Sequence, residues 1–210
     1  MTTSCKPDVR RDFRRGAEAF AAVVRGIGSG SWERAALGVW NVRDLVGHTS
    51  RALLTVESYL DATELTDNPA IRDAVGYLRA AAAALADPAA VAERGRQAGA
   101  ALGDDPAATV SALADRVLQL VECSDDDARV GTPVGTMTLT GYLPTRTFEL
   151  AVHTLDLAAA TGMTAPAELG EALAASLQLA ADLAIDAGRV ADVLLAVTGR
   201  RALPDGFSLL

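Results

Sequence analysis

Apolar residues recur every three or four positions along most of this chain of 210 residues. The first stretch of this kind contains Val9, Phe13, Ala17, Phe20, Val24 and Ile27. Such spacing places the apolar side chains on one face of an α-helix. The same period returns in segment after segment. It predicts helices over about 8–28, 41–60, 70–86, 88–101, 107–123, 140–161, 167–187 and 189–197, followed by a tail over 198–210.

Local signals support several of these boundaries. Asn41 and Asp44 have the spacing of a capping box, with Asp in the place of the usual Glu or Gln. Pro88 suits the first turn of a helix, and Gly162 suits the position just after one. The stretch around 130–139 is rich in Gly, Thr and Val and lacks helical period, so it predicts a loop or short hairpin.

These patterns together predict an all-α fold, a helical bundle with additional C-terminal helices. We expect the bundle to occupy residues 1–165. Residues 166–210 would then form a C-terminal helical extension packed on it.

Composition narrows the classes of partner. The net charge of −8 argues against nucleic acid, because phosphate binding needs clustered Lys and Arg. No apolar run is long enough to span a bilayer, and no secretory signal is visible. Cys5 and Cys123 lack the spacing of a redox or metal motif, and a structural or tail role is the simpler interpretation. We therefore expect a cytoplasmic protein without membrane partners, either a monomer or, through its alanine-rich helix faces, a homodimer.

The candidate chemistry centres on the two histidines, His48 and His153, both in predicted helices. Glu149 precedes His153 by four residues, so the two side chains project from one face of their helix. An imidazole from a neighbouring helix would complete a two-histidine, one-carboxylate metal site with a position left open. This ligand set is found in catalytic zinc sites and in non-haem iron sites, and spacing alone does not separate the two metals.

Other interpretations of the same residues stay open at this stage. One stripe of the helix over 140–161 carries Tyr142, Arg146, Glu149, His153 and Asp156. It could be a solvated polar face, and His48, at the flank of an apolar stripe, could be a surface residue. Asp44 and Asp156 each lie one turn from a histidine and could orient its ring, although Asp44 could instead act only as a helix cap. Arg146 could contact an anionic substrate or pair with Glu149 or Tyr142.

Two segments carry a family resemblance, WNVRDLVGH at 40–48 and RTFELAVHTLD at 146–156. They resemble the signature stretches of the mycothiol-dependent maleylpyruvate isomerase family, within the DinB-like metal-binding four-helix bundles. The resemblance implies that His48, Glu149 and His153 bind a divalent metal, commonly zinc. It also implies mycothiol as the co-substrate. Arg146, Tyr142 and Asp156 would orient substrate or support the metal ligands.

The isomerase of this family carries a separate C-terminal α/β domain that helps to hold the substrate carboxylates. The residues after Gly162 predict helices and a tail instead. We therefore expect a metal-dependent enzyme that activates a small thiol for transfer to, or isomerisation of, a small electrophilic substrate. One alternative is a non-catalytic metal-binding helical module with a structural or sensing role. Another is a metal-free helical protein in which His48 and Glu149 lie far apart.

Overall fold

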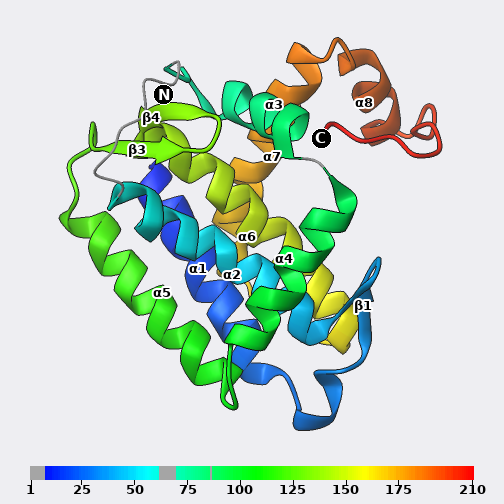
Figure 1. Ribbon diagram of the computed structural model, residues 1–210. Helices are drawn as coiled ribbons and strands as arrows, with labels where there is room; N and C mark the ends of the chain where they lie inside the picture. Colours follow the sequence, from blue (N-terminus) through cyan, green and yellow to red (C-terminus); the bar gives the residue numbers. More distant parts are fainter. Residues whose placement is uncertain (1–7, 62–69, 86) are drawn as a thin grey trace.

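Four long helices form the centre of the molecule. The computed structural model describes residues 8–61, 70–85 and 87–210 (Figure 1). The four helices are α1 (Val9–Gly26), α2 (Val42–Leu60), α5 (Pro106–Cys123) and α6 (Leu139–Thr161). Helices α1 and α2 each contact both α5 and α6, so the four close into a bundle. The prediction of an all-α bundle is confirmed.

The remaining helices cover the outside of this bundle. They are α3 (Ala74–Leu85), α4 (Pro88–Ala101), α7 (Leu169–Asp186), α8 (Val190–Val197) and the single 3₁₀ turn η1 (Ser29–Ser31). Helix α4 lies along α2, α3 lies against α6 and α7, and α7 lies against α1 and α6. Helix α6 is thus covered by neighbours on several sides, and this arrangement decides which of its faces are buried.

Two short antiparallel hairpins precede α2 and α6. Strands β3 (Arg129–Thr132) and β4 (Gly135–Thr138) pair from Arg129 opposite Thr138 to Thr132 opposite Gly135. They confirm the hairpin predicted around 130–139. Strands β1 (Ala35–Leu37) and β2 (Trp40–Asn41) were not predicted. Gly38, with φ of 57°, makes the turn between them in the left-handed region that favours glycine.

The core lies between the bundle helices and is built from the apolar stripes. Phe13, Phe20, Leu53 and Leu150 are fully buried there, and so is Leu143 two turns before Leu150. Burying each such side chain contributes about 1.5–3 kcal/mol to the free energy of folding. The amphipathic pattern therefore accounts both for the helices and for their assembly.

One predicted boundary was wrong. The helix expected from residue 70 begins at Ala74, because the preceding backbone is held by the second hairpin. Ala70 forms a parallel bridge with Thr136, and the Ile71 amide donates a 2.8 Å hydrogen bond to the Thr136 carbonyl. An extended backbone at this point cannot also be helical, so the helix starts later.

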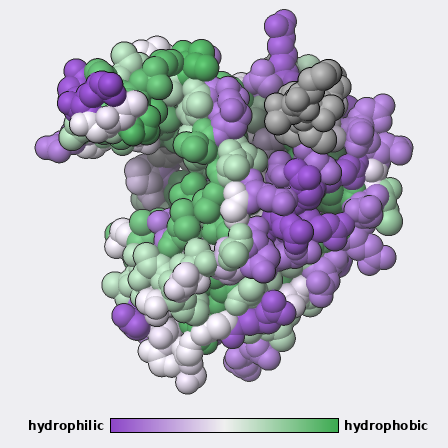
Figure 2. Space-filling view, turned by 180° about the vertical axis from the view of Figure 1, so that it is seen from behind, coloured by the Kyte–Doolittle hydropathy of each residue, from purple (hydrophilic) through white to green (hydrophobic). Residues whose placement is uncertain are grey.

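The C-terminal helices differ in how far they enter the core. Helix α7 buries Leu169, Ala172 and Leu183, whereas α8 buries none of its residues. Seen from behind, hydrophobic residues cover much of the side on which α8 projects, and the surface is hollowed beneath it (Figure 2). The division of the chain at residue 165 stays a prediction. Within the described ranges, no helix combines the length and the apolarity that a bilayer span requires.

Candidate metal centre

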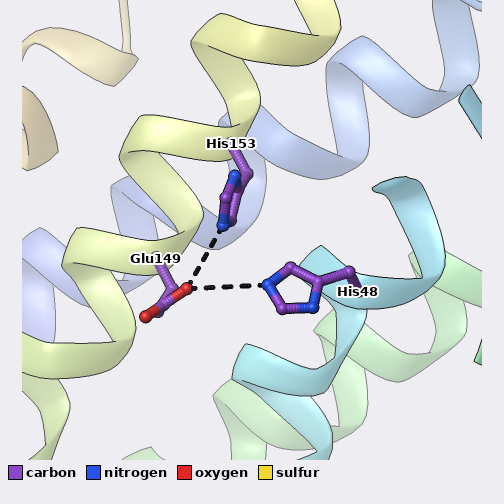
Figure 3. A group of neighbouring side chains, drawn as sticks. All are labelled: His48, Glu149 and His153. Atoms are coloured by element: carbon purple, nitrogen blue, oxygen red, sulfur yellow. Dashed lines mark ion pairs between the residues drawn. The ribbon is translucent and has the colours of Figure 1, made fainter. Parts of the chain in front are cut away.

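Helices α2 and α6 bring three potential ligands together. His48 projects from α2, and Glu149 and His153 project from successive turns of α6 (Figure 3). Glu149 Oε2 lies 3.3 Å from His153 Nε2 and 4.0 Å from His48 Nε2. One ligand atom from each residue lies within 4.8 Å of the others. In the part of the chain that the structure describes, this is the only such cluster of three His, Cys, Asp or Glu side chains.

The position of His48 follows from the start of its helix. The Asn41 side chain accepts a 2.8 Å hydrogen bond from the Asp44 amide, and Asp44 Oδ2 accepts one of 3.4 Å from the Asn41 amide. The predicted capping box is therefore present, and Asp44 serves it rather than orienting the imidazole. His48 Nδ1 is buried and has no hydrogen-bond partner among the described residues.

Glycines let α4 approach α2 beside the histidine. A Cβ at Gly47 would lie 2.1 Å from the Gly99 amide nitrogen, and one at Gly95 would lie 2.7 Å from the Trp40 ring. Trp40 donates from Nε1 to the Ala92 carbonyl at 3.0 Å, and its ring centroid lies 4.4 Å from that of His48. The Trp40 ring thus supports the imidazole.

This packing of α4 and Trp40 beside His48 was not predicted from the sequence, because the segment 88–101 shows only the pattern of an alanine-rich helix. The two glycines four residues apart in that helix are the signal that could have indicated close contact, because glycine lets two backbones approach.

Burial and the neighbouring charges give the three groups different protonation states. Burial, reinforced by the nearby His153, lowers the pKa of His48 to about 4. Burial would raise the pKa of Glu149, but the hydrogen bond from His153 and the charge of Arg146 lower it to about 2. At neutral pH, His48 is therefore neutral and Glu149 ionised, which are the forms that bind metal ions.

His153 is held between two carboxylates. Its Nδ1 lies 3.0 Å from Asp156 Oδ2, and its Nε2 faces Glu149. Burial lowers the pKa of His153, but the hydrogen bonds to Asp156 and Glu149 outweigh it and raise the pKa to about 9. Asp156 thus holds the ring so that Nε2 points toward the other two ligands.

The polar stripe of α6 faces inward, so its interpretation as a solvated face is wrong. Tyr142 is fully buried and Arg146 is 9% exposed, while Val152 and Leu155 on the other side are 36% and 41% exposed. The Arg146 guanidinium lies 4.9 Å from the Tyr142 ring centroid and 5.5 Å from that of Tyr77. Arg146 therefore pairs with Tyr142, one of the partners expected for it.

Residues 13–158 match the family model described as the mycothiol maleylpyruvate isomerase N-terminal domain. The chain belongs to this family. The matched segment contains α2 and α6, and therefore all three candidate ligands. Comparisons with curated proteins and with solved structures gave no match.

The three side chains of this maleylpyruvate isomerase family member fit a divalent cation. With bonds of about 2.0–2.1 Å, neighbouring ligand atoms of a tetrahedral zinc ion lie roughly 3.4 Å apart. The separations of 3.3 Å and 4.0 Å around Glu149 lie close to this value. Two imidazoles and one carboxylate also match the ligand chemistry of zinc, once His153 gives up its proton. Cys123 is exposed and is not part of this set, and Cys5 lies outside the described residues.

Replacing Asp156 with Asn is expected to weaken divalent-metal binding by about 10–100-fold, because the imidazole loses the carboxylate that orients it. Competition titration with a chromophoric chelator measures this change. Asp182→Asn, on an exposed part of α7, is the matched control and is expected to leave the affinity unchanged. An Asp156→Asn protein that binds metal as tightly as the parent would show that this family member does not depend on the contact.

Metal binding is expected to release about one proton at pH 7.5, because the metal must displace the proton from His153. The pKa of about 9 lies above the ordinary value of 6.5. In the metal-free protein, protonation of His153 therefore stabilises the fold fully below pH 6.5, and this contribution is lost as the pH rises through 9. Calorimetry in buffers of different ionisation enthalpy counts the protons. Release of almost none at pH 7.5 would contradict the raised pKa.

Proposed function

We propose that this protein is a divalent-metal-dependent enzyme that activates a low-molecular-weight thiol for transfer to, or isomerisation of, a small electrophilic substrate. The convergence of His48, Glu149 and His153 within 4.8 Å carries the proposal. Three protein ligands are the set used by catalytic zinc sites, whose remaining position takes water or substrate. The family name supplies mycothiol as the proposed thiol.

Access to the site supports a catalytic rather than a sealed structural centre. The side chains of His48, Glu149 and His153 are 19%, 27% and 15% exposed. Structural zinc sites are closed by four protein ligands, whereas the described residues place three here. A small molecule could therefore reach the ligands from outside the bundle.

Each residue around the site has a definable part in this chemistry. A bound divalent cation would lower the pKa of a thiol held at its open position. His48, Glu149 and His153 would hold the cation, for which we propose zinc. Asp156 keeps the His153 ring oriented, and Arg146 helps to keep Glu149 ionised. Tyr142 is fully buried and donates a 3.0 Å hydrogen bond to Thr55 Oγ1, so its proposed role is to position Arg146.

Metal analysis followed by calorimetry tests the proposal. The purified protein is expected to contain one divalent ion per chain and to bind mycothiol only before chelation, with binding restored when zinc is returned. Turnover of mycothiol with a panel of electrophiles is then expected to follow the metal content. Thiol binding that is indifferent to chelation would overturn the proposal. Metal binding that stabilises the fold, without thiol binding, would favour a structural or sensing module.

The proposed cellular location of the enzyme follows from its proposed co-substrate. We place it in the cytoplasm, where reducing conditions keep a small thiol in its reactive form. A monomer and a homodimer both remain compatible with the proposed site, because its three ligands come from one chain.

A further inference from the structure

A cavity beside Glu149 is one feature that the metal centre does not explain. It has a volume of about 540 Å³ and lies between the β1–β2 hairpin, α3 and α4. Cavities of roughly 300–1,000 Å³ are typical of sites for small molecules. Because Glu149 lines this cavity, a molecule bound there would lie next to one of the three proposed metal ligands.

The lining of this cavity is almost entirely apolar. Val39, Trp40, Leu78, Ala82 and Val91 contribute to it, and Glu149 is the only ionisable side chain among the described lining residues. The Trp40 indole N–H is already donated to the Ala92 carbonyl. The described lining residues therefore offer hydrophobic contact and no free side-chain donor for an anion.

A carboxylate placed in this cavity would be strongly disfavoured. It would lose part of its water without gaining a cationic partner among the described lining residues, and it would lie near the ionised Glu149. Arg146 does not line the cavity, because its guanidinium lies over the rings of Tyr77 and Tyr142. An uncharged hydrocarbon group would instead be stabilised by leaving water.

We propose that this cavity binds the hydrocarbon part of the electrophilic substrate, so that the enzyme acts on uncharged, hydrophobic electrophiles rather than on dicarboxylates. This inference rests on the proposed function. For an alkene conjugated to a ketone, the thiol sulfur forms a bond to the β-carbon while the π bond breaks. The thiol proton ends on the α-carbon, so the addition needs no other reactant.

Two probes that differ by one carboxylate group test the inference. They are trans-4-phenyl-3-buten-2-one and its 4-carboxyphenyl analogue, which carry the same reactive alkene. With the zinc-loaded enzyme and mycothiol, kcat/KM for the uncharged enone is expected to exceed that for the carboxylate by at least about tenfold, once the uncatalysed rates are subtracted. Equal rates, or a preference for the carboxylate, would overturn the inference.

Variants of α3 test whether the preference for the uncharged enone arises in this cavity. Ala82 is half-buried at the cavity, and Ala83, the next residue, is exposed and absent from the lining. Ala82→Arg is expected to shift the preference toward the carboxylate by at least about tenfold, and Ala82→Asp to lower kcat/KM for the uncharged enone by a similar factor. Ala83→Arg and Ala83→Asp are the matched controls and are expected to change neither. Ala82 variants that behave like these controls would overturn the assignment of the cavity.

A binding measurement separates this inference from the proposed function. The saturated ketone 4-phenylbutan-2-one and its carboxylated analogue are titrated by calorimetry into metal-free protein, with no thiol present. Preferential binding of the uncharged ketone, lost in Ala82→Asp and kept in Ala83→Asp, supports the cavity assignment even if no turnover is found. If the parent protein shows no metal-dependent thiol binding, the proposed function is overturned but the assignment of the cavity to uncharged ligands stands. Tighter binding of the carboxylated ketone would overturn the cavity assignment and leave the proposed function intact.

Discussion

Replacing Glu149 with Gln is expected to lower the affinity for zinc by more than about 100-fold. Loss of an outer-shell partner of a metal ligand typically costs 10–100-fold, and Glu149 is proposed as a ligand itself. It is also the only carboxylate among the three groups that converge, so the variant removes the negative charge that offsets the charge of the cation. The thiol-dependent activity is expected to fall with the metal content. Competition titration and metal analysis measure the two effects.

Glu122→Gln is the matched control for this experiment. Glu122 is an exposed residue of α5 whose carboxylate pairs with Arg14, and it takes no part in the site. It is expected to retain full metal content and activity. Circular dichroism of both variants checks that the bundle remains folded. A folded Glu149→Gln protein with the zinc affinity of the parent would exclude Glu149 as a ligand.

Replacing Gly47 with Ala is expected to destabilise the fold by about 3 kcal/mol or more. The new Cβ would lie 2.1 Å from the backbone nitrogen of Gly99, and a backbone atom cannot turn away as a side chain can. Helices α2 and α4 must therefore separate, which moves His48, the next residue along the chain. We expect a lower midpoint of urea denaturation and weaker metal binding together.

Gly170→Ala provides the comparison for this substitution. Gly170 lies in the first turn of α7, with no neighbouring atom within 4 Å of the added Cβ. Alanine there is expected to leave stability unchanged or to raise it by up to about 1 kcal/mol, because it restricts the unfolded chain. If Gly47→Ala were as stable as Gly170→Ala, the close contact of α2 with α4 would not exist in solution.

The order of the helices and most of their bounds could be predicted from the sequence because they depend on local signals. The apolar period, the capping box at Asn41 and Asp44, and Gly162 after α6 act over a few residues, and the structure has all of them. The hairpin before α2 was not predicted, since its strands are two and three residues long and leave no alternating pattern. The late start of α3 depends on contact with Thr136, which lies far away in the sequence.

The candidate site could be predicted only in part, because it too depends on contacts between residues that are far apart in the sequence. The spacing of Glu149 and His153 indicates that both project from one face, but it does not indicate what that face contacts. A polar stripe has the same period whether it faces water or a neighbouring helix. The approach of His48 depends on the packing of α2 against α6, which residue spacing does not encode. The family resemblance, rather than the spacing, identified His48 as the third member.

The most direct test of the central claim is a crystal structure of the zinc-loaded protein with anomalous diffraction data collected on both sides of the zinc absorption edge. We expect one zinc peak per chain, about 2.1 Å from the Nε2 atoms of His48 and His153 and in contact with the Glu149 carboxylate. A zinc ion bound elsewhere, with these three side chains left uncoordinated, would contradict the assignment.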